Sequence, residues 1–178
     1  MDLEGIVIDP IHIFCEEEYE MQNPTNPDHF QVVKHKDTQK KFYLIKRGEN
    51  FNYSTKSSFI FKIENSFKLI HPAIINLSGY SITKPYLYYK YSQSPLYIND
   101  IDLTDTTVQI IFLGIASGLS YLLSKSYYIS NFSIKSVIFD KIFYPKLIDY
   151  INLPDINETH KKDSIVQYSQ FIQEILNK

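Results

Sequence analysis

The sequence predicts an α+β fold in two parts, a β-rich part followed by a mainly helical part. The chain has 178 residues, enough for one domain with a substantial core. Short runs rich in β-branched and aromatic residues fill the first half, with one helical pattern among them. One long apolar segment and a C-terminal amphipathic segment follow, so strands precede helices. We expect the boundary near residues 91–95.

The first part begins with short β-rich runs. Residues 16–21, EEEYEM, are expected to form an edge strand, and the Asn-Pro pairs of residues 23–28 a turn. Residues 30–34 and 41–46 flank a polar turn, a pattern that predicts a hairpin.

One helix interrupts these strands. Residues 57–70 predict an amphipathic helix that ends at His71-Pro72. Its apolar positions recur every three or four residues, at Phe59, Ile60, Ile63, Phe67 and Ile70. Residues 73–77 and 86–91 then predict two further strands.

The second part is mainly helical. Polar residues 102–106 favour a helix start, and residues 108–123 predict a long apolar helix that runs to about Lys125. Short β-rich runs follow at 136–139 and 146–148. Residues 164–176 predict the last helix.

Composition excludes several classes of function. A net charge of -2 gives no electrostatic case for nucleic acid or an anionic membrane as a partner. One cysteine supports neither a disulfide framework nor a structural zinc site. The apolar run 108–123 is shorter than the roughly 20 residues that span a bilayer. We expect a core helix there and a cytoplasmic protein.

Four sequence strings, in this order, resemble the eukaryotic protein-kinase domain. They are VVKHKDTQKKFYLIK at 32–46, HPAII at 71–75, LGIASGLSYLLSKS at 113–126 and FYPKLIDY at 143–150. They are similar to two small-lobe strands with the V-A-I-K lysine, the H-P-N-I-V segment, the helix before the catalytic loop and the strand that enters D-F-G.

The resemblance implies a single kinase-like domain over residues 1–178. We expect a β-rich small lobe at about 14–92 with one αC-like helix, and a large lobe at about 93–178. The large lobe is expected to be incomplete, because the later kinase helices have no counterpart in this sequence.

The same resemblance assigns ligands for ATP and Mg²⁺. Lys46 stands at the lysine that binds the phosphates, and Asp149 at the D-F-G aspartate that binds metal. Tyr89 lies near the gatekeeper position at the rear of the adenine pocket. The resemblance thus implies ATP at Lys46, and Mg²⁺ at Asp149 together with the bound nucleotide.

Other positions of the pattern have lost the residues that catalysis needs. H-R-D reads Ile129-Ser130-Asn131, so an amide replaces the general base, a loss worth about 10² to 10⁴ in rate. Ser133 replaces the catalytic-loop lysine and Ser136 the second metal ligand. Lys62 stands at the αC glutamate, with Glu64 two residues on, and we expect Lys62 to face Lys46. The phosphate-loop glycines are replaced by Asn23, Thr25 and Asp28.

Three functions follow from this pattern. The first is a catalytically impaired pseudokinase that acts as an interaction or regulatory module in signalling, with a protein partner. The second is a weakly active ATP-dependent kinase that uses Lys46 and Asp149. The third is a non-functional kinase gene fragment. The residues leave enzymatic activity open.

Overall fold

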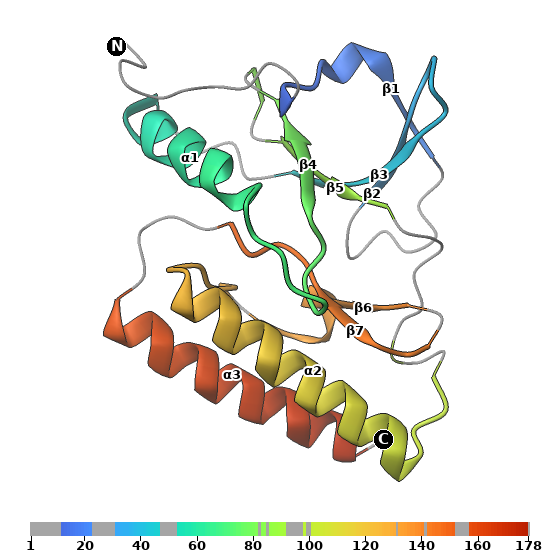
Figure 1. Ribbon diagram of the computed structural model, residues 1–178, viewed down its shortest axis with the longest axis vertical. Coiled ribbons are helices and arrows are strands. Elements are labelled where there is room, and N and C mark those ends of the chain that lie inside the picture. The colour runs from blue at the N-terminus through green and yellow to red at the C-terminus, as the bar shows by residue number, and fades with distance from the viewer. Residues whose placement is uncertain are drawn as a thin grey trace. The chain divides into compact units, whose positions relative to one another are not determined.

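The computed structural model describes residues 12–22, 31–46, 53–81, 83–84, 86–91, 98, 101–130, 132–140, 142–151 and 157–177 (Figure 1). The predicted α+β class is confirmed. The chain folds into two compact units. Unit 1 comprises Met1–Leu69 and Asn76–Tyr91, and unit 2 comprises Ile70–Ile75 and Ser92–Lys178.

Unit 1 contains a five-stranded antiparallel sheet in the order β1-β2-β3-β5-β4. Its strands are β1 Tyr19–Met21, β2 Gln31–His35, β3 Lys41–Lys46, β4 Leu77–Tyr80 and β5 Tyr86–Lys90. The predicted hairpin is confirmed as β2 and β3. The edge strand predicted at 16–21 is right only for β1. Residues Glu16–Glu18 instead form a 3-10 helix, closed by the N–H of Glu18 on the carbonyl of Cys15 at 3.1 Å.

Both faces of this sheet carry buried side chains. The consecutive β5 residues Leu87, Tyr88 and Tyr89 are at most 1% exposed. Successive strand side chains point to opposite faces, so neither face is open at these positions. The strand register separates two sets of buried residues. The Tyr88 face carries Val33, Leu44 and Tyr88, and the Tyr89 face carries Tyr43, Tyr80, Leu87 and Tyr89.

Helix α1, Tyr53–Ser66, connects β3 to β4. Phe59, Ile60 and Ile63 are buried at the predicted helical spacing. The predicted range 57–70 is shifted towards the C-terminus, however. The side chains of Asn65 and Ser66 bond the carbonyls of residues 61 and 63, at 3.0 and 2.7 Å, and so satisfy the last turn. Ile70 falls beyond the helix and is 77% exposed.

Unit 2 holds two long helices and a short hairpin. Its elements are α2 Asp105–Ser124, β6 Val137–Phe139, β7 Pro145–Leu147 and α3 Glu158–Leu176, with a 3-10 turn at Ile134–Ser136. The hydroxyl of Thr104 caps α2 by accepting the N–H of Thr107 at 3.2 Å, as the polar residues there predict. Helix α3 begins before the predicted residue 164. Asn157 caps α3 by accepting the N–H of His160 at 2.9 Å. The first turns of the helix are polar, so the apolar pattern that predicts a helix begins only at residue 164.

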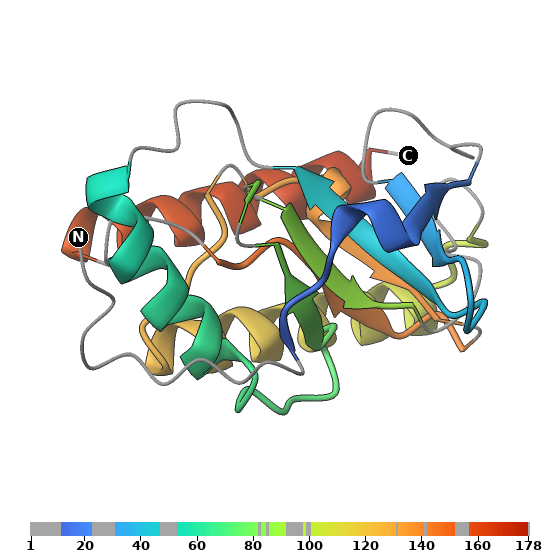
Figure 2. The ribbon, with the colours of Figure 1, turned by 90° about the horizontal axis from the view of Figure 1, so that it is seen from above.

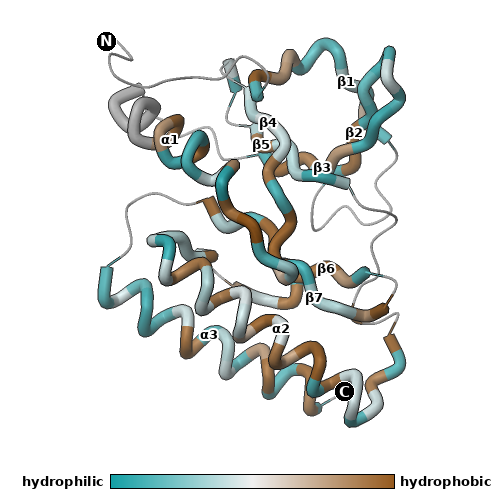
Figure 3. The backbone as a smooth tube through the Cα atoms, viewed as in Figure 1, coloured by the Kyte–Doolittle hydropathy of each residue, from teal (hydrophilic) through white to brown (hydrophobic). Residues whose placement is uncertain are grey.

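Helix α2 contacts β7 and α3, and its buried residues form one apolar stripe. The stripe consists of Ile111, Gly114, Ile115, Gly118, Leu119 and Leu122. Hydrophobic residues extend along much of α2, whereas α3 alternates between hydrophobic and hydrophilic residues (Figure 3). Among the described residues, α2 is the helix with the length and hydropathy of a membrane span, and 33% of that window is buried. Core helices pass the same test, so α2 is weak support for a membrane span.

Residues 70–75 belong to unit 2, although they lie between α1 and β4 in the chain. Ile74 forms a parallel bridge with Leu147 of β7. The N–H of Ile75 bonds the carbonyl of Leu147 at 3.0 Å, and the N–H of Leu147 bonds the carbonyl of Ala73 at 2.8 Å. The single strand predicted at 73–77 is therefore wrong. Residues 73–75 extend the β6–β7 hairpin, and β4 starts at Leu77.

Candidate functional site

Lys46, predicted to bind nucleotide phosphates, is exposed at the end of β3. It pairs with Tyr86, and its Nζ lies 5.5 Å from the centre of the Tyr86 ring. Paired residues share a face and alternate residues do not, so Lys46 lies on the Tyr88 face. Tyr89, near the predicted gatekeeper position, pairs with Tyr43 on the other face. Lys46 and Tyr89 therefore do not line one pocket on a single face of this sheet, and the nucleotide role of Lys46 stays a prediction.

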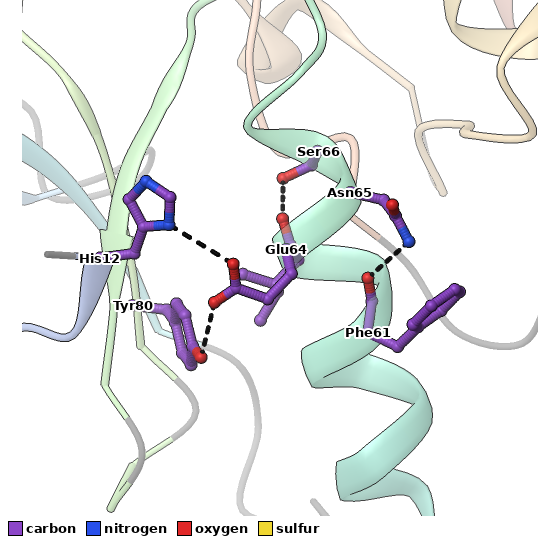
Figure 4. Close-up of polar contacts among 7 residues, drawn as sticks. His12, Phe61, Glu64, Asn65, Ser66 and Tyr80 are labelled. Atoms are coloured by element: carbon purple, nitrogen blue, oxygen red, sulfur yellow. Dashed lines mark hydrogen bonds and ion pairs between the residues drawn. The ribbon is translucent and has the colours of Figure 1, made fainter. Parts of the chain in front are cut away.

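Helix α1 contacts the Tyr89 face through Glu64 (Figure 4). The hydroxyl of Tyr80 donates to Oε1 of Glu64 at 3.0 Å, and Nδ1 of His12 lies 3.4 Å from Oε2. Burial raises the pKa of the Tyr80 hydroxyl above its usual range, and the hydrogen bond to Glu64 raises it further. Lys62, on the same helix, is only 8% exposed. Lys46 by contrast is exposed, and the expectation that the two lysines face each other stays a prediction.

Asp149, the predicted metal ligand, lies just after β7 in unit 2. Its φ is 66°, in the left-handed region that few residues other than glycine adopt. The next residue, Tyr150, is fully buried, and its hydroxyl donates to the carbonyl of Ile75 at 3.0 Å. Aspartate adopts this region more readily than most residues, so the conformation suits a turn residue, and the metal role of Asp149 stays a prediction.

Ser136, at the predicted second metal position, is held within its own loop. It is 8% exposed, and its hydroxyl accepts the N–H of Ser133 at 3.3 Å. The hydroxyl of Ser133 in turn accepts the N–H of Lys135 at 3.3 Å. The carbonyl of Ser136 accepts the N–H of Ile148 at 3.1 Å, so Ser136 and Asp149 lie at the same end of the hairpin.

Several predicted positions lie outside the described residues. They are Asn131, at the general base, and Asn23, Thr25 and Asp28, at the phosphate-loop glycines. The residue after Asn131, Phe132, is described. Its N–H donates to Oε1 of Gln167 on α3 at 2.7 Å, and its ring packs on Phe171, with the centroids 5.4 Å apart. The loop after α2 is thus attached to α3.

His71 and Ser117 form a close pair that invites a catalytic interpretation. The hydroxyl of Ser117 lies 3.2 Å from Nε2 of His71, while Nδ1 accepts the N–H of Ala73 at 3.1 Å. The neutral imidazole must then carry its proton on Nε2, the atom that would have to take the serine proton. Burial lowers the pKa of His71, and the charge of Lys146 lowers it further. The pair therefore orients the 70–75 segment and does not activate a nucleophile.

The predicted Mg²⁺ role of Asp149 stays a prediction. No group of three or more His, Cys, Asp or Glu side chains in the part of the chain that the structure describes is placed to hold a metal ion. Magnesium in phosphoryl-transfer sites uses one or two carboxylates together with substrate phosphates. Asp149 fits such a role only with a bound nucleotide.

Two contacts of this site were not predicted from the sequence. Glu64 lies four residues after Ile60, on the apolar stripe of α1, and a carboxylate there needs a polar partner. That signal was present, but the partners His12 and Tyr80 are distant in the chain. The hydrogen bond from Phe132 to Gln167 has no local signal, because nothing in the sequence around Gln167 marks its side chain as the acceptor of a distant backbone N–H.

Comparisons with known proteins leave the family of this chain unassigned. No protein-family model matches it, and no curated protein matches it either.

Proposed function

We propose that this chain is a kinase-like domain with impaired catalysis that acts as an interaction or regulatory module for a protein partner. The observation that carries the proposal concerns Ser136, which stands at the predicted position of the second metal ligand. Its hydroxyl is nearly buried and accepts the N–H of Ser133 in the same loop. The kinase-like part is supported by the type of element found at three of the four strings, namely a hairpin at 32–46 (β2 and β3), a helix at 113–126 (α2) and a strand at 143–150 (β7). With Asn131 at the base position, phosphoryl transfer would lack both a base and a metal ligand.

A weakly active kinase is the second candidate. The retained carboxylate of Asp149 favours it, because this residue lies just after β7, at the position of the D-F-G aspartate in the resemblance. In this proposal Lys46 would bind ATP phosphates and Asp149 would bind Mg²⁺.

Thermal shift with ATP, with and without Mg²⁺, separates the two candidates. A ligand at 100 times its Kd stabilises the native state by about 2.7 kcal/mol, a shift that is easily measured. We expect no shift at millimolar ATP and no transfer of labelled phosphate to a protein substrate. The matched variants are Lys46→Ala, Asp149→Ala and Lys90→Ala, the last an exposed lysine at the end of β5.

The outcome that contradicts impaired catalysis is specific. It is a Mg²⁺-dependent shift with phosphate transfer that Lys46→Ala and Asp149→Ala abolish and Lys90→Ala leaves intact. A cooperative melt of the purified chain in the same assay counts against a gene fragment that does not fold.

A further inference from the structure

Residues 12–21, the strap, cross the sheet of unit 1 from one edge to the other. At the β4 edge, Ile13 forms a parallel bridge with Tyr80, and the N–H of Phe14 bonds the Tyr80 carbonyl at 2.9 Å. At the other edge, the strap ends as β1, paired with β2. Figure 2 shows it running over the strands, in blue. The strap therefore covers the Tyr88 face.

One aromatic side chain anchors the strap. The ring of Phe14 lies over Gly79, where any Cβ would approach the ring to 2.4 Å. Its centroid is 5.0 Å from that of Tyr88 and 5.2 Å from that of Phe42. Tyr19 closes the cluster, with its centroid 5.3 Å from that of Phe14. The missing side chain at Gly79 thus makes a recess for a flat ring.

On either side of this recess, polar groups of unit 1 contact strap residues that lie two positions before and two positions after Phe14. Two residues before Phe14, the imidazole of His12 lies beside Glu64 and stacks on Phe67 with the centroids 3.5 Å apart. Two residues after it, the carboxylate of Glu16 accepts hydrogen bonds from the hydroxyls of Ser81 and Thr83, the latter at 2.7 Å. The surface therefore contacts an imidazole, an aromatic ring and a carboxylate at alternate positions of the strap.

The strap is a peripheral layer and not a core strand. None of its residues is fully buried, and Ile13 and Met21 are 37% and 50% exposed. Beneath it, Val33, Leu44 and Tyr88 are at most 4% exposed. Segments with few buried side chains open at lower free energy than the core they cover.

We propose that the strap occupies a peptide-docking surface in cis, and that an extended segment of a partner protein can take its place. The partner segment makes the main-chain hydrogen bond to the Tyr80 carbonyl at the β4 edge, crosses the sheet as the strap does, and carries a histidine-x-aromatic-x-acidic pattern like that of His12, Phe14 and Glu16. The proposal rests on the interaction-module function and names its surface and its partner class.

Native-state hydrogen exchange on the full chain tests whether the strap is displaceable. We expect the amide of Phe14 to exchange at least about tenfold faster than the core amides of β3 and β5, with a weaker dependence on denaturant. Exchange of Phe14 together with those core amides would show an integral strand and overturn the proposal. This measurement needs no variant, so it is independent of any folding defect.

A labelled synthetic peptide of residues 12–21 tests the surface itself. We expect it to bind the full-length Phe14→Ala chain at least about tenfold more tightly than the wild type, whose surface is occupied. Adding Gly79→Val fills the recess and should abolish binding, and a peptide with alanine in place of Phe14 should not bind. Equal binding to wild type and folded Phe14→Ala chains would overturn the proposal. Phosphate transfer in the kinase assay would contradict impaired catalysis but leave this result unchanged.

Discussion

Glu64 is the residue whose partners make the sharpest stability prediction. Its side chain is 13% exposed, and it accepts the hydroxyl of the buried Tyr80. Glu64→Leu leaves that hydroxyl without its acceptor and should cost about 1–3 kcal/mol in urea unfolding, whereas Glu64→Gln keeps an acceptor and should cost less. Glu158→Ala, at an exposed ion pair with Lys161, is the control and should stay within about 0.5 kcal/mol. Equal losses for Glu64→Leu and Glu158→Ala would contradict the prediction.

His71 gives a prediction for the dependence of stability on pH. Its pKa is lowered in the folded state, first by burial and then by Lys146. A histidine with a depressed folded pKa stabilises the protein fully above its unfolded pKa, about 6.5, and loses that contribution as the pH falls through the folded pKa. We expect unfolding to become easier below about pH 6.5, and less so in His71→Gln. In an NMR titration, Lys146→Gln should raise the pKa of His71. An unchanged pKa in that variant would remove the proposed role of the lysine.

At the scale of elements, Gly114 and Gly118 of α2 determine how closely β7 approaches that helix. A Cβ at Gly114 would lie 2.5 Å from Cγ of Pro145, part of a rigid ring. Gly→Ala in a helix normally stabilises by about 1 kcal/mol, but overpacking costs about 1–3 kcal/mol. We therefore expect Gly114→Ala to destabilise unit 2 in thermal unfolding. Ser120→Ala, on the exposed side of the same helix, should be neutral or slightly stabilising. A Gly114→Ala chain more stable than the wild type would show that the hairpin can move away.

The elements differ in how well the sequence predicts them, and the reason is physical. The β2–β3 hairpin and α2 follow from local pattern, since alternation, a polar turn and a capping threonine are all short-range signals. The predicted end of α1 is wrong because the apolar spacing continues to Ile70, whereas the side chains of Asn65 and Ser66 bond the carbonyls of the last turn and end the helix there. The start of α3 was wrong because its first turns are polar and exposed.

At the scale of the whole molecule, long-range contacts are what the sequence does not reveal. Residues 70–75 have a recognisable local string, yet their place in unit 2 depends on hydrogen bonds to Leu147, far along the chain. Lys46 and Tyr89 were assigned to one site by analogy, and only the register of β3 against β5 places them on opposite faces. Candidate residues can thus be named from sequence strings, whereas their orientation requires the fold.

The division into units makes a prediction at two neighbouring points of the chain. The N–H of Ile75 bonds Leu147 in unit 2, while the next residue, Asn76, accepts the N–H of Lys90 at 2.8 Å in unit 1. In native-state hydrogen exchange, we expect Ile75 to follow Leu147 in its dependence on denaturant, and not Lys90. Gly118→Val crowds Leu147 and Ala73, so it should speed exchange at Ile75 and Leu147 by about tenfold and leave Lys90 near its wild-type rate. If Ile75 instead follows Lys90, residues 70–75 behave as part of unit 1, and their hydrogen bonds to β7 contribute little to their stability.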